Sequence, residues 1–163
     1  MISFAQAQDK LHQLCRTWLA TYPDPSEPLS LRESLGRYLT QDVIAALELP
    51  RSDVSAMDGY AVCSQGGEGG LTSQVFTLKG ESRAGKPYSG GPLAPGECVR
   101  IFTGAVVPES ADTVVIQENV ERNSASVRML QSTSFGANIR RRGEEIGAES
   151  VIATAGQLIT PNT

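Results

Sequence analysis

Histidine is almost absent from this chain of 163 residues, and the other residues that usually bind transition metals are few. His12 is the one histidine, and the three cysteines, Cys15, Cys63 and Cys98, lie far apart in the sequence. Zinc, copper and iron sites need several nitrogen or sulfur ligands close together, so the sequence argues against all three metals. The odd number of cysteines also argues against a disulfide framework and indicates a reducing compartment. Any metal used here is expected to have oxygen ligands, which indicates magnesium.

Long apolar runs and a surplus of positive charge are also missing. No apolar stretch approaches the roughly 20 residues that a membrane helix needs, and the first residues lack the charged and then apolar layout of a signal peptide. The formal net charge is -4, whereas nonspecific binding to nucleic acid requires an excess of lysine and arginine on one face. We therefore expect a cytoplasmic protein that binds neither nucleic acid nor membranes.

The front of the chain predicts two helices. Apolar residues recur at helical spacing from residue 3 to about residue 19, with one stripe expected to be buried, and Ser3 with Gln6 forms a capping box. A second, shorter helix is predicted to begin at Ser30, where Glu33 completes another capping box and leucines follow along one side.

From residue 43 onward, short apolar runs alternate with clusters of glycine, proline, serine and asparagine, which is typical of strands and turns. The glycine-rich stretch Ser64–Gly70 is expected to be a flexible loop. The fold class is therefore α+β and mostly β, with a mixed β domain inserted into a base of helices and strands. The predicted strands are Val43–Leu47, Tyr60–Cys63, Gln74–Leu78, Cys98–Phe102, Thr113–Gln117, Ser126–Leu130 and two short strands within Val151–Thr160.

The segment LPRSDVSAMDGYAV at residues 49–62 is the most specific motif. Asp58-Gly59 predicts a turn before a strand, because glycine tolerates positive φ and aspartate hydrogen-bonds to nearby backbone. A plain turn remains one interpretation. However, Ser55, Asp58 and Tyr60 make a dense polar group, and a carboxylate on a rigid turn suits a contact with magnesium or substrate.

Two further segments have residues suited to anions. A predicted strand leads into Thr103-Gly104-Ala105, where small residues allow backbone amides to approach an anion, although a simple loop between strands is the alternative. NIRRRGEEI at residues 138–146 places three arginines before two glutamates. Such a charge run is usually a solvated face, but arginine also binds phosphate-like groups through its planar fork.

In this fixed order, the segments resemble the molybdopterin molybdenumtransferase family, called MoeA in bacteria and the gephyrin E domain in animals. SAMDGYA at residues 55–61 matches the family's hallmark. IFTGAVVPESADTV at residues 101–114 and RRRGEEI at residues 140–146 match two more family motifs, with weaker support from AGKPY and PGE. Three motifs in order make a chance match very unlikely.

The resemblance implies a discontinuous, elongated first domain of residues 1–44 with 136–163, and an inserted β-rich second domain of residues 45–135. The family's third domain, which binds the pterin, and its fourth domain are absent from this chain. The resemblance also implies a homodimer, with the active cleft between the second domain of one subunit and the third domain of its partner. This chain alone is therefore expected to be inactive.

The implied activity belongs to molybdenum cofactor biosynthesis: molybdate and adenylylated molybdopterin react, with Mg2+, to give the molybdenum cofactor and AMP. The family's active-site positions fall on Asp58, Thr103 and Glu145, with Asp58 as a magnesium ligand. Glu145 stands where the family usually has aspartate, which moves the charge by about one carbon–carbon bond. The residues expected to bind substrate are Ser55, Gly104, Arg140 and Arg142.

Two other functions are consistent with parts of the sequence. A non-catalytic scaffold or partner-binding module could descend from the same family, although a scaffold has no need for the polar group in SAMDGYA. A β-rich binder of carbohydrate or peptide would explain the short strands but none of the three motifs.

Overall fold

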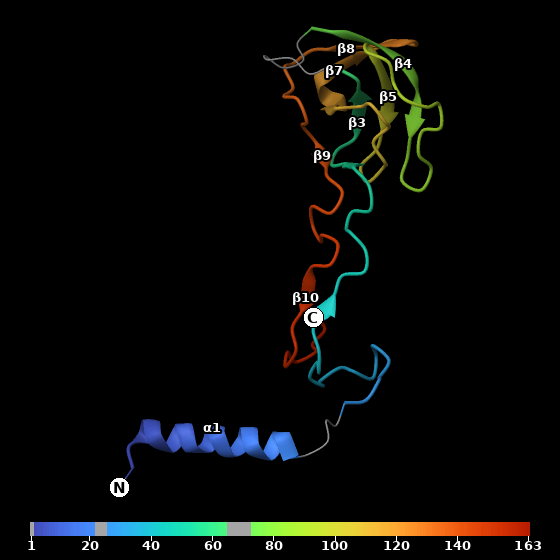
Figure 1. The fold of residues 1–163 in the computed structure, drawn as a ribbon. Helices are drawn as coiled ribbons and strands as arrows, with labels where there is room; N and C mark the ends of the chain where they lie inside the picture. The colour runs from blue at the N-terminus through green and yellow to red at the C-terminus, as the bar shows by residue number, and fades with distance from the viewer. Residues whose placement is uncertain (1, 22–25, 65–72) are drawn as a thin grey trace. The chain divides into compact units, whose positions relative to one another are not determined.

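The computed structural model describes residues 2–21, 26–64 and 73–163 and divides into two compact units. One unit contains residues up to 43 together with 153–163, and the other contains residues 44–152. The predicted class, α+β and mostly β, is confirmed, because the described residues form one α-helix and many strands (Figure 1). The predicted division into 1–44 with 136–163 and 45–135 stays a prediction, because compact units need not coincide with family domains.

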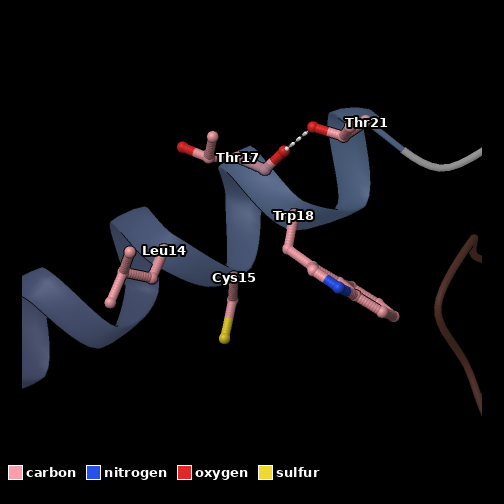
Figure 2. Close-up of a pocket in the computed structure, with 5 residues that line it drawn as sticks. All are labelled: Leu14, Cys15, Thr17, Trp18 and Thr21. Atoms are coloured by element: carbon pink, nitrogen blue, oxygen red, sulfur yellow. Dashed lines mark hydrogen bonds between the residues drawn. The ribbon is translucent and has the colours of Figure 1, made fainter.

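The first predicted helix is present as α1 (Phe4–Thr21). Its capping box is also confirmed: the amide of Ser3 donates to Gln6 Oε1 at 2.9 Å, and the amide of Gln6 donates to Ser3 Oγ at 3.2 Å. The expected buried stripe is wrong, because no residue of α1 is buried. Figure 2 shows Cys15 and Trp18 extending from one side of the helix. Helical periodicity identifies the apolar face of α1, but it does not show whether any other element packs against that face.

The predicted second helix is wrong, although its first turn begins as expected. The Ser30 amide donates to Glu33 Oε2 at 3.3 Å, as in a capping box, but residues 31–36 form only turns. Gly36 adopts φ 78° and donates its amide to the carbonyl of Ile159 at 2.9 Å. A left-handed residue bonded to another segment cannot continue an α-helix, so the turn ends there.

The largest sheet has six strands in the order β6-β3-β5-β4-β8-β7. β4 and β5 are parallel, and the other neighbouring pairs are antiparallel. Residues 65–70 of the predicted flexible loop lie outside the described residues. The strands are β3 (Gly59–Val62), β4 (Val75–Ser82), β5 (Glu97–Ile101), β6 (Thr113–Ile116), β7 (Val120–Arg122) and β8 (Ser126–Met129), and the short 3-10 helix η1 (Gln117–Asn119) follows β6.

The shorter strands form two-stranded ribbons. β1 (Val43–Ile44) pairs with β10 (Val151–Ala153), and β2 (Val54–Ser55) pairs with β9 (Ile139–Arg140). Of these strands, β1 covers only the first two residues of the predicted strand Val43–Leu47, and β10 is the first of the two short strands predicted within Val151–Thr160. Within the part of the chain that the structure describes, the second of those two strands does not form. β2, β7 and β9 were not predicted.

Strands β3, β5 and β6 are buried on both faces of the sheet, which explains why they are almost continuously apolar. Successive side chains of a strand point to opposite faces. One face therefore holds a cluster that includes Tyr60, Cys98 and Val115, and the other holds a cluster that includes Ala61 and Val99. Burial raises the pKa of the Cys98 thiol to about 12, so this cysteine is a core residue and not a reactive group.

Candidate functional site

The three sequence motifs meet around β2, the short strand at the start of SAMDGYA. On one side, the Ser55 amide donates to the carbonyl of Ala105 at 2.9 Å, and the Ser55 carbonyl accepts from the Gly104 amide at 2.8 Å. On the other side, β9 pairs Val54 with Arg140. Backbone hydrogen bonds therefore hold the second and third motifs against the two edges of the first.

Asp58 and Thr103 form the most specific side-chain contact between the motifs. Asp58 Oδ1 accepts the backbone amide of Thr103 at 2.9 Å and the hydroxyl of Thr103 at 2.8 Å. These two hydrogen bonds, amide first, and the positive charge of Arg100 lower the pKa of the Asp58 carboxyl. Thr103 is exposed, and Asp58 is half-buried. Asp58 is therefore an ionised, oriented carboxylate at neutral pH.

The amides of the Thr103-Gly104-Ala105 turn are all used within the chain. The Thr103 amide donates to Asp58, the Gly104 amide to the carbonyl of Ser55, and the Ala105 amide to the carbonyl of Phe102 at 2.9 Å. The sequence predicted that these amides approach an external anion. In the structure, the anion that this turn binds is the carboxylate of Asp58.

Ser55 and Gly104, which were predicted to bind substrate, shape the backbone in this structure. Ser55 is 1% exposed, and its hydroxyl donates to the carbonyl of Met57 at 2.6 Å. Gly104 has φ 78°, a left-handed conformation that favours glycine. Their contact with substrate stays a prediction.

The arginines of the third motif are paired with carboxylates. Arg140 Nη1 lies 2.7 Å from Glu145 Oε1. The side chain of Arg142 contacts Glu48, and its amide donates to Asp53 Oδ1 at 2.8 Å. The side chains of Arg140 and Arg142 are 57% and 66% exposed. Exposed ion pairs contribute little to stability, so these arginines can exchange partners at small cost.

Arg100 is a functional candidate that the sequence analysis did not single out. Its Nη1 donates to the carbonyl of Gly59 at 3.3 Å, and its Nη2 donates to the side chain of Gln117. Its guanidinium carbon lies 5.1 Å from the ring centre of Tyr60 and 4.9 Å from that of Phe102. The sequence signal for Arg100 is that it is the single charged residue in the apolar run CVRIF. The alternation of side chains along a strand, taken alone, predicts that such a residue lies on a solvated face.

An open hollow on α1 contains none of these motif residues (Figure 2). Within it, the hydroxyl of Thr21 donates to the carbonyl of Thr17 at 2.8 Å. Among the residues that the structure describes, no charged side chain lines this hollow. Its lining residues are Leu14, Cys15, Thr17, Trp18 and Thr21.

Comparison with known proteins agrees with the motifs. Residues 2–163 match the family model described as the MoeA N-terminal region (domain I and II). The chain belongs to the MoeA family. It is 35% identical, over 99% of its length, to the molybdopterin molybdenumtransferase of Haemophilus influenzae, of which it covers 38%. It is also 35% identical, over 80% of its length, to molybdopterin molybdenumtransferase 2 of Mycobacterium tuberculosis, of which it covers 33%.

A solved structure shows the same relationship. The molybdopterin biosynthesis MoeA protein of Pyrococcus horikoshii matches with a TM-score of 0.75 and 28% identity, over 83% of this chain and 36% of that one. This MoeA-family chain therefore spans little more than a third of the length of the relatives it matches.

The resemblance of this MoeA-family chain implied magnesium, and the residues present fit one part of such a site. Among the described residues, no group of three or more His, Cys, Asp or Glu could hold a metal ion. Asp58 can still offer one ligand, since both of its hydrogen bonds from Thr103 end on Oδ1. Magnesium is often bound through one or two carboxylates together with water and substrate phosphates. Also within the described residues, no helix is long and apolar enough to cross a membrane.

Proposed function

We propose that the protein containing this chain transfers molybdenum from molybdate into adenylylated molybdopterin and releases AMP, in the cytoplasm. The observation that carries the proposal is the meeting of the three motifs around β2, with the oriented carboxylate of Asp58 beside them. The proposal is supported by the similarity to molybdopterin molybdenumtransferases over 99% of this chain.

The role proposed for Asp58 follows from its charge and its hydrogen bonds. Because Thr103 lowers the pKa of the Asp58 carboxyl, this group is an acceptor at neutral pH and not a proton donor. Thr103 fixes Oδ1 with two hydrogen bonds and leaves Oδ2 to face a cation or a substrate donor. Thr103 therefore acts by orienting Asp58.

Magnesium, when bound, would neutralise charge on the phosphate oxygens as the phosphoanhydride link is cleaved. Asp58 would hold it through Oδ2. Arg140 and Arg142 would bind anionic oxygens of the substrate after leaving their present carboxylate partners, and Arg140 orients Glu145 until then. Ser55 and Gly104 maintain the backbone on which these groups lie.

The proposed active cleft lies between the second domain of one subunit and the third domain of its partner in a homodimer. This chain would then supply one wall of the cleft. Catalysis of this kind depends on holding two anionic reactants against each other, and such positioning accounts for roughly 7 to 11 kcal/mol of barrier lowering. One wall of the cleft cannot by itself hold both reactants in position.

The test is the Asp58→Asn substitution in the full-length protein, with AMP release from adenylylated molybdopterin as the assay. Asparagine keeps an oxygen that can accept the Thr103 amide, so the turn is retained while the negative charge is lost. We expect AMP release to fall by roughly 100-fold or more.

The matched control is Asp42→Asn. Asp42 also accepts a backbone amide, that of Ala155 at 2.8 Å, but it lies outside the three motifs. This control is expected to keep full activity. Full activity in a folded Asp58→Asn protein would remove Asp58 from the catalytic group, and absence of AMP release from the unaltered full-length protein would favour a non-catalytic scaffold.

A further inference from the structure

We propose that Arg100 is a positioning residue that holds the Asp58–Gly59 turn in the orientation required for molybdenum insertion. This inference rests on the proposed function. It concerns an arginine that lies in β5, one strand away from the turn that it would hold.

The strand register explains why Arg100 reaches this turn. β3 and β5 pair Tyr60 with Arg100, and β4 and β5 pair Glu81 with Arg100. Phe102 follows two positions after Arg100, so both side chains leave the same side of the strand. Arg100 thereby lies beside the rings of Tyr60 and Phe102, with its guanidinium carbon 5.1 and 4.9 Å from their centres. These distances lie within the range of cation–π attraction.

Two sets of hydrogen bonds connect Arg100 to the backbone around Asp58. The first is direct: Arg100 Nη1 donates to the carbonyl of Gly59, the residue after Asp58, at 3.3 Å. The second passes through Gln117, whose side chain accepts from Arg100 and whose amide donates to the carbonyl of Asp58 at 3.1 Å. Arg100 therefore bonds the carbonyl of Gly59 directly, and it contacts the residue, Gln117, that bonds the carbonyl of Asp58.

The same contacts argue against a direct role for Arg100 in binding substrate. Both terminal nitrogens already donate hydrogen bonds within the chain, and two rings lie against the guanidinium. By contrast, Thr103 donates two hydrogen bonds to the side chain of Asp58 itself. Arg100 thus supports the backbone of the turn, while Thr103 orients its carboxylate.

The test compares Arg100→Met, Arg100→Lys and Arg128→Met in the full-length protein. Methionine keeps an unbranched stem but removes the charge and the donors. Lysine keeps the charge but lacks the planar fork that bonds two acceptors and lies against two rings. Arg128 is an exposed arginine of β8 in the same sheet, outside this network, and serves as the control.

We expect Arg100→Met to lower kcat for AMP release by about 10- to 100-fold, the cost of a small misplacement of a catalytic group, with KM for the pterin substrate nearly unchanged. Arg100→Lys should recover only part of this loss, and Arg128→Met should match the unaltered protein. An unchanged kcat in Arg100→Met would overturn the inference. A raised KM with unchanged kcat would overturn it in favour of a substrate contact. Full recovery in Arg100→Lys would also overturn it, in favour of an effect of the positive charge alone.

A second measurement does not depend on activity. Hydrogen–deuterium exchange in the full-length protein reports on the amides of Thr103 and Gln117, which donate to the side chain and carbonyl of Asp58. Both should exchange about tenfold faster in Arg100→Met and Arg100→Lys than in Arg128→Met, which corresponds to the loss of about one hydrogen bond to a charged group. Unchanged exchange would overturn the inference. If the unaltered protein releases no AMP, the proposed function fails, while exchange still decides the role of Arg100.

Discussion

Replacement of Gly59 in SAMDGYA should destabilise the fold for a steric reason that is independent of catalysis. It lies in β3, directly against the backbone of β6. A Cβ added to Gly59 would lie 2.0 Å from the carbonyl oxygen of Val115 and 3.1 Å from the Cα of Ile116. Contacts of Cβ below 3.0 Å essentially never occur, so in Gly59→Ala the strands must separate by about 1 Å.

The magnitude follows from what this separation disrupts. Overpacking costs about 1 to 3 kcal/mol by itself. β3 and β6 are joined over four residue pairs, from Gly59↔Ile116 to Val62↔Thr113, and each weakened backbone hydrogen bond adds up to about 1 kcal/mol. We therefore expect Gly59→Ala to lower the free energy of unfolding by roughly 3 kcal/mol or more.

Urea denaturation followed by far-UV circular dichroism measures this change. Gly147→Ala is the control, since its added Cβ meets nothing within 4 Å and its φ is not positive. The control should shift the free energy of unfolding by less than about 1 kcal/mol. Equal unfolding midpoints for Gly59→Ala and the control would refute the reasoning, because they would show that β6 moves aside freely.

Three further outcomes are expected. Thr103→Val removes the hydroxyl that donates to Asp58 Oδ1 at 2.8 Å, so AMP release by the full-length protein should fall. Thr103→Ser retains the hydroxyl and should retain AMP release, and equal rates in both variants would contradict the orienting role of Thr103. The pKa of Glu97 is lowered from 4.5, first by the hydrogen bond from the Ala94 amide, so the stability it contributes is present above pH 4.5 and is lost as pH falls through its folded pKa. Unfolding midpoints of the unaltered chain and Glu97→Gln should therefore differ at neutral pH and converge in acid, and a constant difference would count against this. The 163-residue chain alone should release no AMP unless the remaining domains are added, and efficient release by the chain alone would refute the split cleft.

The longer strands of the sheet could be predicted from the sequence because burial of their apolar residues determines where these strands form. Phe76, Val99 and Val127 are fully buried or nearly so. Val99 lies in a continuous apolar run that is typical of a strand buried on both faces, whereas Phe76 and Val127 lie in strands whose buried and exposed residues alternate. β2 and β9 have only two residues each. Such strands exist because a distant segment offers backbone partners, and no local pattern indicates that segment.

The two predicted helices also show that local sequence does not determine every element. Ser3 and Gln6 form both hydrogen bonds of a capping box, and a helix follows. Ser30 and Glu33 form one of the two, from the Ser30 amide to Glu33 Oε2 at 3.3 Å, and no helix follows. A second difference is Gly36, which has a left-handed φ and donates its amide to the carbonyl of Ile159. Local propensity proposes a helix, and a competing tertiary hydrogen bond decides whether it continues.

The site could be predicted as a set of motifs but not as a set of partners. Asp58 and Thr103 were each expected at the site for their own chemistry, whereas the structure makes the hydroxyl and amide of Thr103 donors to Asp58 across a separation of 45 residues. A motif also mixes residues with different tasks. Gly59 is required because the backbone of β6 leaves no room for a side chain, while the side chain of Asp58 beside it is half-buried and accepts two hydrogen bonds from Thr103. Asp58→Asn should therefore leave folding nearly intact and remove activity, and Gly59→Ala should destabilise the sheet whether or not the protein is an enzyme, so this pair of variants separates the fold of the motif from its chemistry.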